Sequence, residues 1–101
     1  MSEVNSRIEQ FRKMAEADPN NELGHFSLGK AYLDAGQTKE AIGSFQRSIE
    51  LNPNTAKVYQ LLAEALLKEN RRDEAIERLT KGVEVAAARG DLPRISVRMP
   101  L

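Results

Sequence analysis

Apolar residues recur at spacings of three and four along most of the chain, and this spacing predicts amphipathic helices. The pattern is interrupted at Pro19, Gly36, Pro53, Asn70 and Gly90. Proline disfavours helical geometry in the residue before it, and glycine or asparagine readily adopts the left-handed turn that ends many helices. We therefore expect helices at residues 3–17, 22–35, 38–51, 55–69 and 72–89.

The apolar faces and the residues at the helix starts refine this interpretation. Asn20 or Asn21 can cap the second helix, and Thr38 can cap the third. The first helix has one apolar stripe, formed by Val4, Ile8, Phe11, Met14 and Ala15. The buried face of the third helix is expected to contain Ala41, Ile42, Phe45, Ser48 and Ile49. The fifth helix is expected to bury Ala75, Ile76, Leu79, Val83 and Ala86.

The sequence also repeats itself with a period of 34 residues. A forward shift by one period superimposes Leu28 on Leu62, Gly29 on Ala63, Ala41 on Ala75 and Phe45 on Leu79. A backward shift superimposes Phe45 on Phe11 and Pro53 on Pro19. A fixed period of this length, with small residues at matching points, indicates a solenoid of helical hairpins.

The motif within each period resembles the tetratricopeptide repeat family. It runs His25-x2-Leu28-Gly29-x2-Tyr32, then Ala41-x3-Phe45, then Pro53. The resemblance covers about residues 3–89 and implies an all-α superhelix. Within a domain at residues 1–90 it implies a capping helix at 3–17, one repeat at 22–55 and a second at 56–89. It further implies that Gly29 lies at the contact inside its own helix pair.

Residues 91–101 depart from the helical pattern. Pro93 and Pro100 interrupt any helix, and apolar residues alternate with polar ones at Ile95, Val97, Met99 and Leu101. A period of two is typical of extended chain, so we expect a non-helical C-terminal extension. It could fill its own groove, fill a neighbour's groove or pair with another tail, because the last helix should leave an apolar edge uncovered. Alternatively, it is a disordered boundary within a longer array.

Composition narrows the classes of function. The chain has 15 basic and 15 acidic side chains, so net charge favours neither nucleic-acid nor membrane binding. A weaker alternative is nucleic-acid binding by Arg71, Arg72, Arg78, Lys81, Arg94 and Arg98. There is no cysteine, no apolar run of membrane-spanning length and no signal-peptide pattern in the first 20 residues, so we expect a cytoplasmic protein.

We find no motif for catalysis, a metal or a cofactor. His25 is the single histidine, and it occupies a position where the family often has tryptophan, so a packing role is expected. Metal sites need several converging ligands, and nucleophilic catalysis needs a nucleophile beside a base; neither grouping is present in the sequence. We therefore expect a protein that is not an enzyme.

The resemblance implies a concave groove that binds a protein or peptide partner. Its candidate residues are Leu23, Phe26, Lys30, Leu33 and Asp34 in the first repeat and Lys57, Gln60, Glu64, Leu67 and Lys68 in the second. Phe26 is notable because the packing motif does not require an aromatic residue there. Its alternative role is packing against the first helix or the tail. We expect an adaptor or scaffold, or alternatively a self-associating module, possibly a homodimer, whose groove or edge holds its own or a sister tail.

One subgroup of the family binds the C-terminal carboxylate of chaperone tails with a clamp of Lys, Asn and Arg. The matching positions here hold Phe26 and Lys30 in the first repeat and Leu61 in the second. Lys57 is basic, but Leu61 stands where the clamp has arginine. We therefore expect no chaperone-tail binding of this kind.

Overall fold

The structure is a computed structural model that describes residues 3–90, with side chains described from residue 5 onward. Within this range the chain forms helices α1 (Glu3–Ala17), α2 (Glu22–Asp34), α3 (Thr38–Leu51), α4 (Ala56–Lys68) and α5 (Arg72–Ala88). The all-α prediction is confirmed, and each predicted helix end lies within one residue of the observed one. The expected non-helical extension at 91–101 lies outside the described residues.

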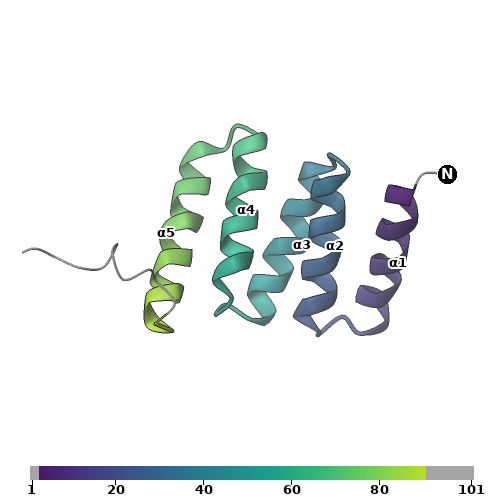
Figure 1. Cartoon of the computed structure of the whole chain (residues 1–101), viewed down its shortest axis with the longest axis horizontal. Helices are drawn as coiled ribbons and strands as arrows, with labels where there is room; N and C mark the ends of the chain where they lie inside the picture. Colours follow the sequence, from purple (N-terminus) through teal and green to yellow (C-terminus); the bar gives the residue numbers. More distant parts are fainter. Residues whose placement is uncertain (1–2, 91–101) are drawn as a thin grey trace, which may run out of the picture.

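The helices stand side by side in a row, in chain order (Figure 1). The pairs α2–α3 and α4–α5 are the two helical hairpins, and α1 packs on α2 as the capping helix. The hairpins are joined through α3 and α4, and α2 also contacts α4. The helices that open the two repeats are therefore neighbours in space.

Left-handed residues end three of the helices, as the sequence predicts. Gly36 and Gly90 have φ values of 80° and 76°, and Asn70 has a φ of 61°. Asn70 occupies the same repeat position as Gly36, and asparagine tolerates this conformation better than most residues that carry a side chain. The two hairpins therefore use equivalent turns.

Of the predicted caps, one is confirmed and one is wrong. The side-chain oxygen of Asn21 accepts a hydrogen bond from the Leu23 amide at 2.9 Å, which satisfies a free donor at the start of α2. Thr38 does not cap α3, because Gln37 is the cap residue and Thr38 is the first helical residue. Its hydroxyl instead donates to the Gly36 carbonyl at 3.5 Å.

The core has two parts. The larger cluster lies between the hairpins and contains Ala41, Ile42, Phe45, Ile49, Val58, Tyr59, Leu61, Leu62, Ala63, Ala65, Leu66, Ala75 and Val85. The smaller cluster joins α1 to α2 and contains Ile8, Ala15, Leu28 and Ala31. Gly29 lies at the contact inside its hairpin, since an added Cβ would stand 2.6 Å from the Phe45 ring. This position agrees with the one that the family resemblance implies.

The expected burial of the terminal helices is partly wrong. On α1, Met14 is exposed, and the side chain of Val4 lies outside the described residues. On α5, Ala75 is buried, Ala86 is half-buried, and Ile76, Leu79 and Val83 are exposed. The reason is the position of these helices in the row: among the described elements, α1 packs only on α2 and α5 packs only on α4.

Candidate protein-interaction surface

Two matching stripes of side chains line α2 and α4. The α2 stripe is Leu23, Phe26, Lys30, Leu33 and Asp34, and the α4 stripe is Lys57, Gln60, Glu64, Leu67 and Lys68. The second stripe repeats the first after 34 residues, with spacings that place all five residues on one face of a helix. Because α2 contacts α4, the stripes lie next to each other, and we call them together the two-stripe surface.

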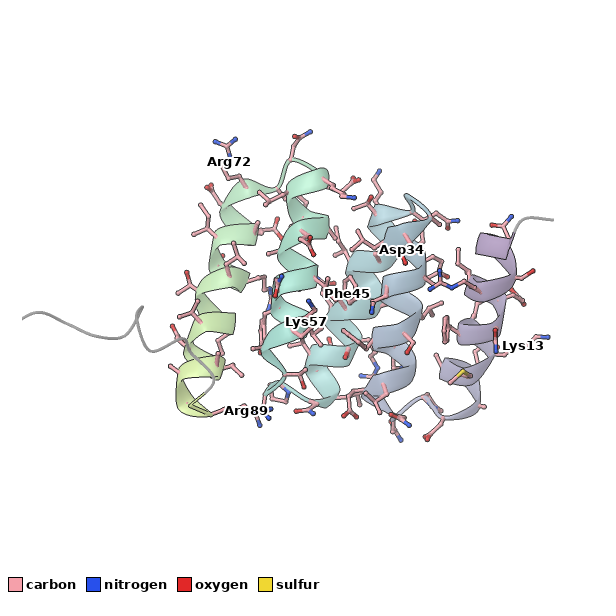
Figure 2. All side chains as sticks on the ribbon, in the orientation of Figure 1. Lys13, Asp34, Phe45, Lys57, Arg72 and Arg89 are labelled. Atoms are coloured by element: carbon pink, nitrogen blue, oxygen red, sulfur yellow. The ribbon has the colours of Figure 1, made fainter. Side chains whose placement is uncertain are left out.

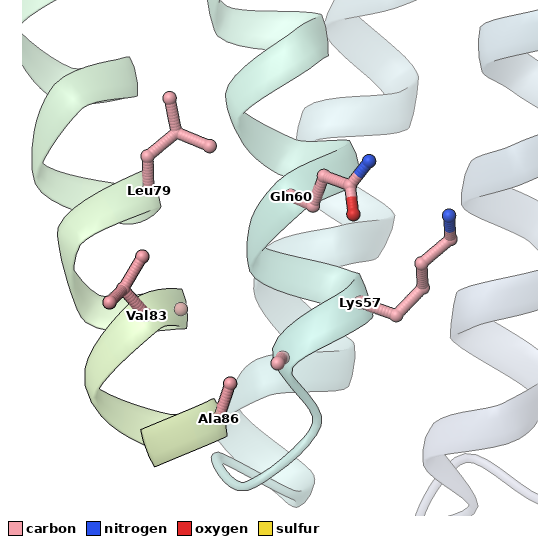
Figure 3. A pocket seen from close by; sticks show the side chains of 7 residues that line it. Lys57, Gln60, Leu79, Val83 and Ala86 are labelled. Atoms are coloured by element: carbon pink, nitrogen blue, oxygen red, sulfur yellow. The ribbon is translucent and has the colours of Figure 1, made fainter. Parts of the chain in front are cut away.

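The two-stripe surface leaves apolar side chains in contact with solvent. Leu23 is 62% exposed and Leu67 is 48% exposed, whereas Leu33 is half-buried against the core. Lys57 extends from α4 towards the side on which α2 stands (Figure 3). The surface therefore combines apolar area for burial with polar groups that can fix the position of a partner.

Phe26 is half-buried between the two-stripe surface and the core. Its ring centroid lies 6.3 Å from that of Phe45 with a tilted geometry, and it packs on the larger core cluster. The Lys30 ammonium lies 5.6 Å from the Phe26 centroid, within the range of a cation–π interaction. Phe26 therefore packs on α3 rather than on α1, which was one of the alternatives considered for it. Packing against the tail lies outside the described residues.

The charges of the two-stripe surface are mixed. It carries the lysines Lys30, Lys57 and Lys68 and the carboxylates Asp34 and Glu64. Asp34 also lies 3.8 Å from Arg7 of α1, an exposed ion pair that contributes little to stability. Figure 2 shows Asp34 on α2 and Lys57 on α4 among the surface side chains. A partner is thus selected by the pattern of charges rather than by one sign.

The residues compared with the chaperone-tail clamp do not form a cluster on this surface. Leu61 is buried in the core, so it cannot contact a partner. The 34-residue register places Gln60, rather than Leu61, opposite Phe26, which corrects the sequence comparison. The position matching Lys30 is Glu64, a carboxylate that would repel a bound carboxylate.

A hollow of about 560 Å³ lies between α4 and α5 (Figure 3). Its lining is mainly apolar and consists of Ala56, Lys57, Gln60, Leu79, Gly82, Val83 and Ala86. Lys57 and Gln60 also belong to the two-stripe surface, so the hollow adjoins it. Sequence reasoning missed this hollow, although Gly82 in place of Ser48 and Ala86 in place of Asn52 signalled lost volume.

The environment of His25 fits a structural role. Its half-buried ring is hydrogen-bonded through Nε2 to the Pro19 carbonyl at 2.9 Å, which ties α2 to the turn after α1. Within residues 3–90 no group of three or more histidine, cysteine or acidic side chains is arranged to hold a metal ion. Among the described helices, none has the length and apolar content needed to cross a bilayer.

The arginines and lysines proposed as a nucleic-acid site have acidic neighbours. Arg71 is paired with Glu74 at 2.7 Å, and Lys81 lies 3.9 Å from Glu84. Glu74 and Glu77 share one shallow depression with Arg78 and Lys81. Arg94 and Arg98 lie outside the described residues. The described part of the patch is therefore mixed in charge, unlike a phosphate-binding stripe.

A row of helical hairpins with such a surface defines a helical-repeat scaffold for protein interaction. The sequence profile of the tetratricopeptide repeat family matches residues 32–94, which is more than half of the chain. The chain belongs to the tetratricopeptide repeat family.

Solved structures of MamA are similar to this chain. A structure of MamA from strain MSR-1 is 30% identical over 84% of this chain and 49% of MamA, with a TM-score of 0.80. One from strain AMB-1 is 32% identical over 84% and 50%, with a TM-score of 0.79. MamA from Desulfovibrio magneticus RS-1 shares the fold at 22% identity, over 84% and 48%, with a TM-score of 0.81. The chain thus spans about half the length of these proteins. No curated protein sequence matches it.

Proposed function

We propose that the chain is an adaptor or scaffold module that binds an extended segment or a helix of a partner protein on the two-stripe surface. The observation that carries this proposal is the exact repetition of five outward-facing positions on two adjacent helices. Repetition over two repeats provides a continuous surface longer than one helix face, as solenoids use for peptide recognition.

The chemistry of the surface describes the partner. Leu23 and Leu67 stand near opposite ends of their stripes and supply apolar contacts, and Lys30 and Lys57 lie between them. Acidic side chains interspersed with apolar ones would match this order. The exposed Phe26 edge offers an additional aromatic contact.

The proposal is tested by selecting binders from a displayed peptide library and measuring their dissociation constants for variants. Leu23→Ser should weaken binding by about tenfold or more, because a leucine buried at an interface contributes about 1.5–3 kcal/mol. Met14→Ser is the matched control: Met14 is 51% exposed, but it lies on α1 outside both stripes. Unchanged binding for Leu23→Ser, or equal losses for both variants, would refute the site.

A second candidate function is self-association, with the groove or an edge occupied by the chain's own or a sister tail. The observation in its favour is the apolar side of α5, where Ile76, Leu79 and Val83 are exposed together. Exposed apolar area of this kind usually marks a contact surface. The solution mass of the full chain separates the two functions, because a monomer excludes the sister chain as occupant.

A further inference from the structure

The exposed apolar side chains of α5 occupy positions that are buried in the preceding repeat. We call Ile76, Leu79 and Val83 the α5 stripe; they are 54%, 42% and 55% exposed. One period earlier, the equivalent residues of α3 are 5%, 0% and 9% exposed and are Ile42, Phe45 and Ile49. α3 is covered by α4, whereas in the described range no element follows α5. The α5 stripe is therefore built like a surface that another segment covers.

The hollow beside the α5 stripe has a cause in the sequence. In the first repeat, the rings of Phe26 and Phe45 fill this place, and the Ser48 hydroxyl donates to the Glu22 carbonyl at 3.2 Å. The second repeat has smaller or polar residues at the same register, namely Gln60, Leu79, Gly82 and Ala56. The space is lined by α4 and α5 together and opens next to Val83. It can therefore receive apolar side chains from a covering segment.

We propose that residues 91–101 of the same chain cover the α5 stripe as an extended segment running antiparallel to α5, with apolar side chains entering the hollow. Gly90, with a φ of 76°, reverses the chain directly after α5, as Gly36 and Asn70 do after α2 and α4. The hollow begins at Ala86, about one helical turn before Gly90. This inference does not depend on the proposed partner site.

The lengths of the two elements match. Every second residue of an extended segment advances by roughly 6.6 Å, and one helical turn advances by about 5.4 Å. The stripe of α5 spans roughly 10 Å from Ile76 to Val83, which a few extended residues cover. Allowing one or two residues for the reversal, the alternating side chains of the tail meet the stripe in order, Ile95 beside Val83, Val97 beside Leu79 and Met99 beside Ile76.

Charge favours the chain's own tail over a second copy of α5. Asp73, Glu77 and Glu84 follow the helical period along the border of the stripe that faces away from α4. The tail carries two arginines and one aspartate, so its charge is opposite to that of this border. A second α5 would bring the same acidic border against the first. The free face of α1 is polar apart from Met14 and offers little apolar area.

The test uses disulfide formation in the full chain, which contains no natural cysteine. The double variant Val83→Cys with Ile95→Cys is oxidised at low protein concentration and compared with Leu23→Cys with Ile95→Cys. Val83 and Leu23 are both more than half exposed, so both variants should fold. We expect an intramolecular disulfide in the first variant at a rate at least about tenfold higher than in the control, because docking raises the effective thiol concentration.

Three results would overturn the proposal. Equal rates in the two variants would mean that the tail samples the surface without docking. Faster bonding to Leu23→Cys would place the tail on the two-stripe surface instead. A disulfide that links two chains in the first variant would make a second copy the occupant of the stripe. Mass spectrometry and gel mobility without reductant distinguish these products.

Discussion

At the scale of single residues, Gly29 and Phe45 determine how closely the first hairpin packs. Phe45 is fully buried, and its ring occupies the place where a Cβ on residue 29 would stand. In the second hairpin Ala63 replaces the glycine and the smaller Leu79 replaces the phenylalanine. The two positions therefore change together, as close packing of helices requires.

We expect Gly29→Ala to lower the free energy of unfolding by about 1–3 kcal/mol, because overpacking a tight contact costs this amount and exceeds the gain in helix propensity. Gly43→Ala is the matched control in α3, since a Cβ there meets nothing within 4 Å. It should raise stability by about 0.5–1 kcal/mol. Urea unfolding of both variants measures the difference, and changes of the same sign would contradict this packing account.

The limits of sequence reasoning are also clearest for individual residues. The turns at Gly36 and Asn70 were predictable, because backbone conformation there depends on local chemistry. The cap at Thr38 was wrongly assigned, since Gln37 and Thr38 are both compatible with a helix start and only the geometry separates them. Likewise, Leu61 and Gln60 differ by one position, and one residue rotates a helical side chain by about 100° from surface to core.

At the scale of the helices, α5 differs most from its expected state. Its helical period was correct, but the burial of Ile76, Leu79 and Val83 depends on a following element that periodicity alone does not specify. The same limit applies to the hollow, which arises from several small substitutions acting together. Sequence could therefore predict the five helices and the two-stripe surface, but not which apolar faces lack a neighbour.

The start of α5 provides a pH-dependent contact. Arg71 donates two hydrogen bonds to Glu74, at 3.0 and 2.7 Å, and these bonds lower the pKa of the Glu74 carboxyl. Because the folded-state pKa is lowered, this contribution to stability is present above the ordinary glutamate pKa of about 4.3 and is lost as pH falls through the lowered value. Arg71→Gln should return the Glu74 pKa towards its ordinary value in a carboxyl NMR titration. An unchanged pKa would show that the pair does not form in solution.

At the scale of the whole molecule, stability is a sum of neighbour contacts along a row of helices. The larger cluster lies in the middle, between α3 and α4, and the end helices each pack on one neighbour. Such an arrangement leaves both the two-stripe surface and the α5 stripe accessible to other segments. The proposed functions assign these surfaces to different occupants, a partner protein on the first and the chain's own tail on the second.

The measurement that tests the central claim most directly is chemical-shift mapping of the ¹⁵N-labelled chain with a selected peptide. We predict that the largest changes follow both stripes, at Leu23, Phe26 and Lys30 on α2 and at Lys57, Gln60 and Glu64 on α4. Simultaneous changes on both helices would show that one ligand spans the two repeats. Changes confined to α5, or to α1 around Met14, would contradict the assignment of the two-stripe surface as the partner site.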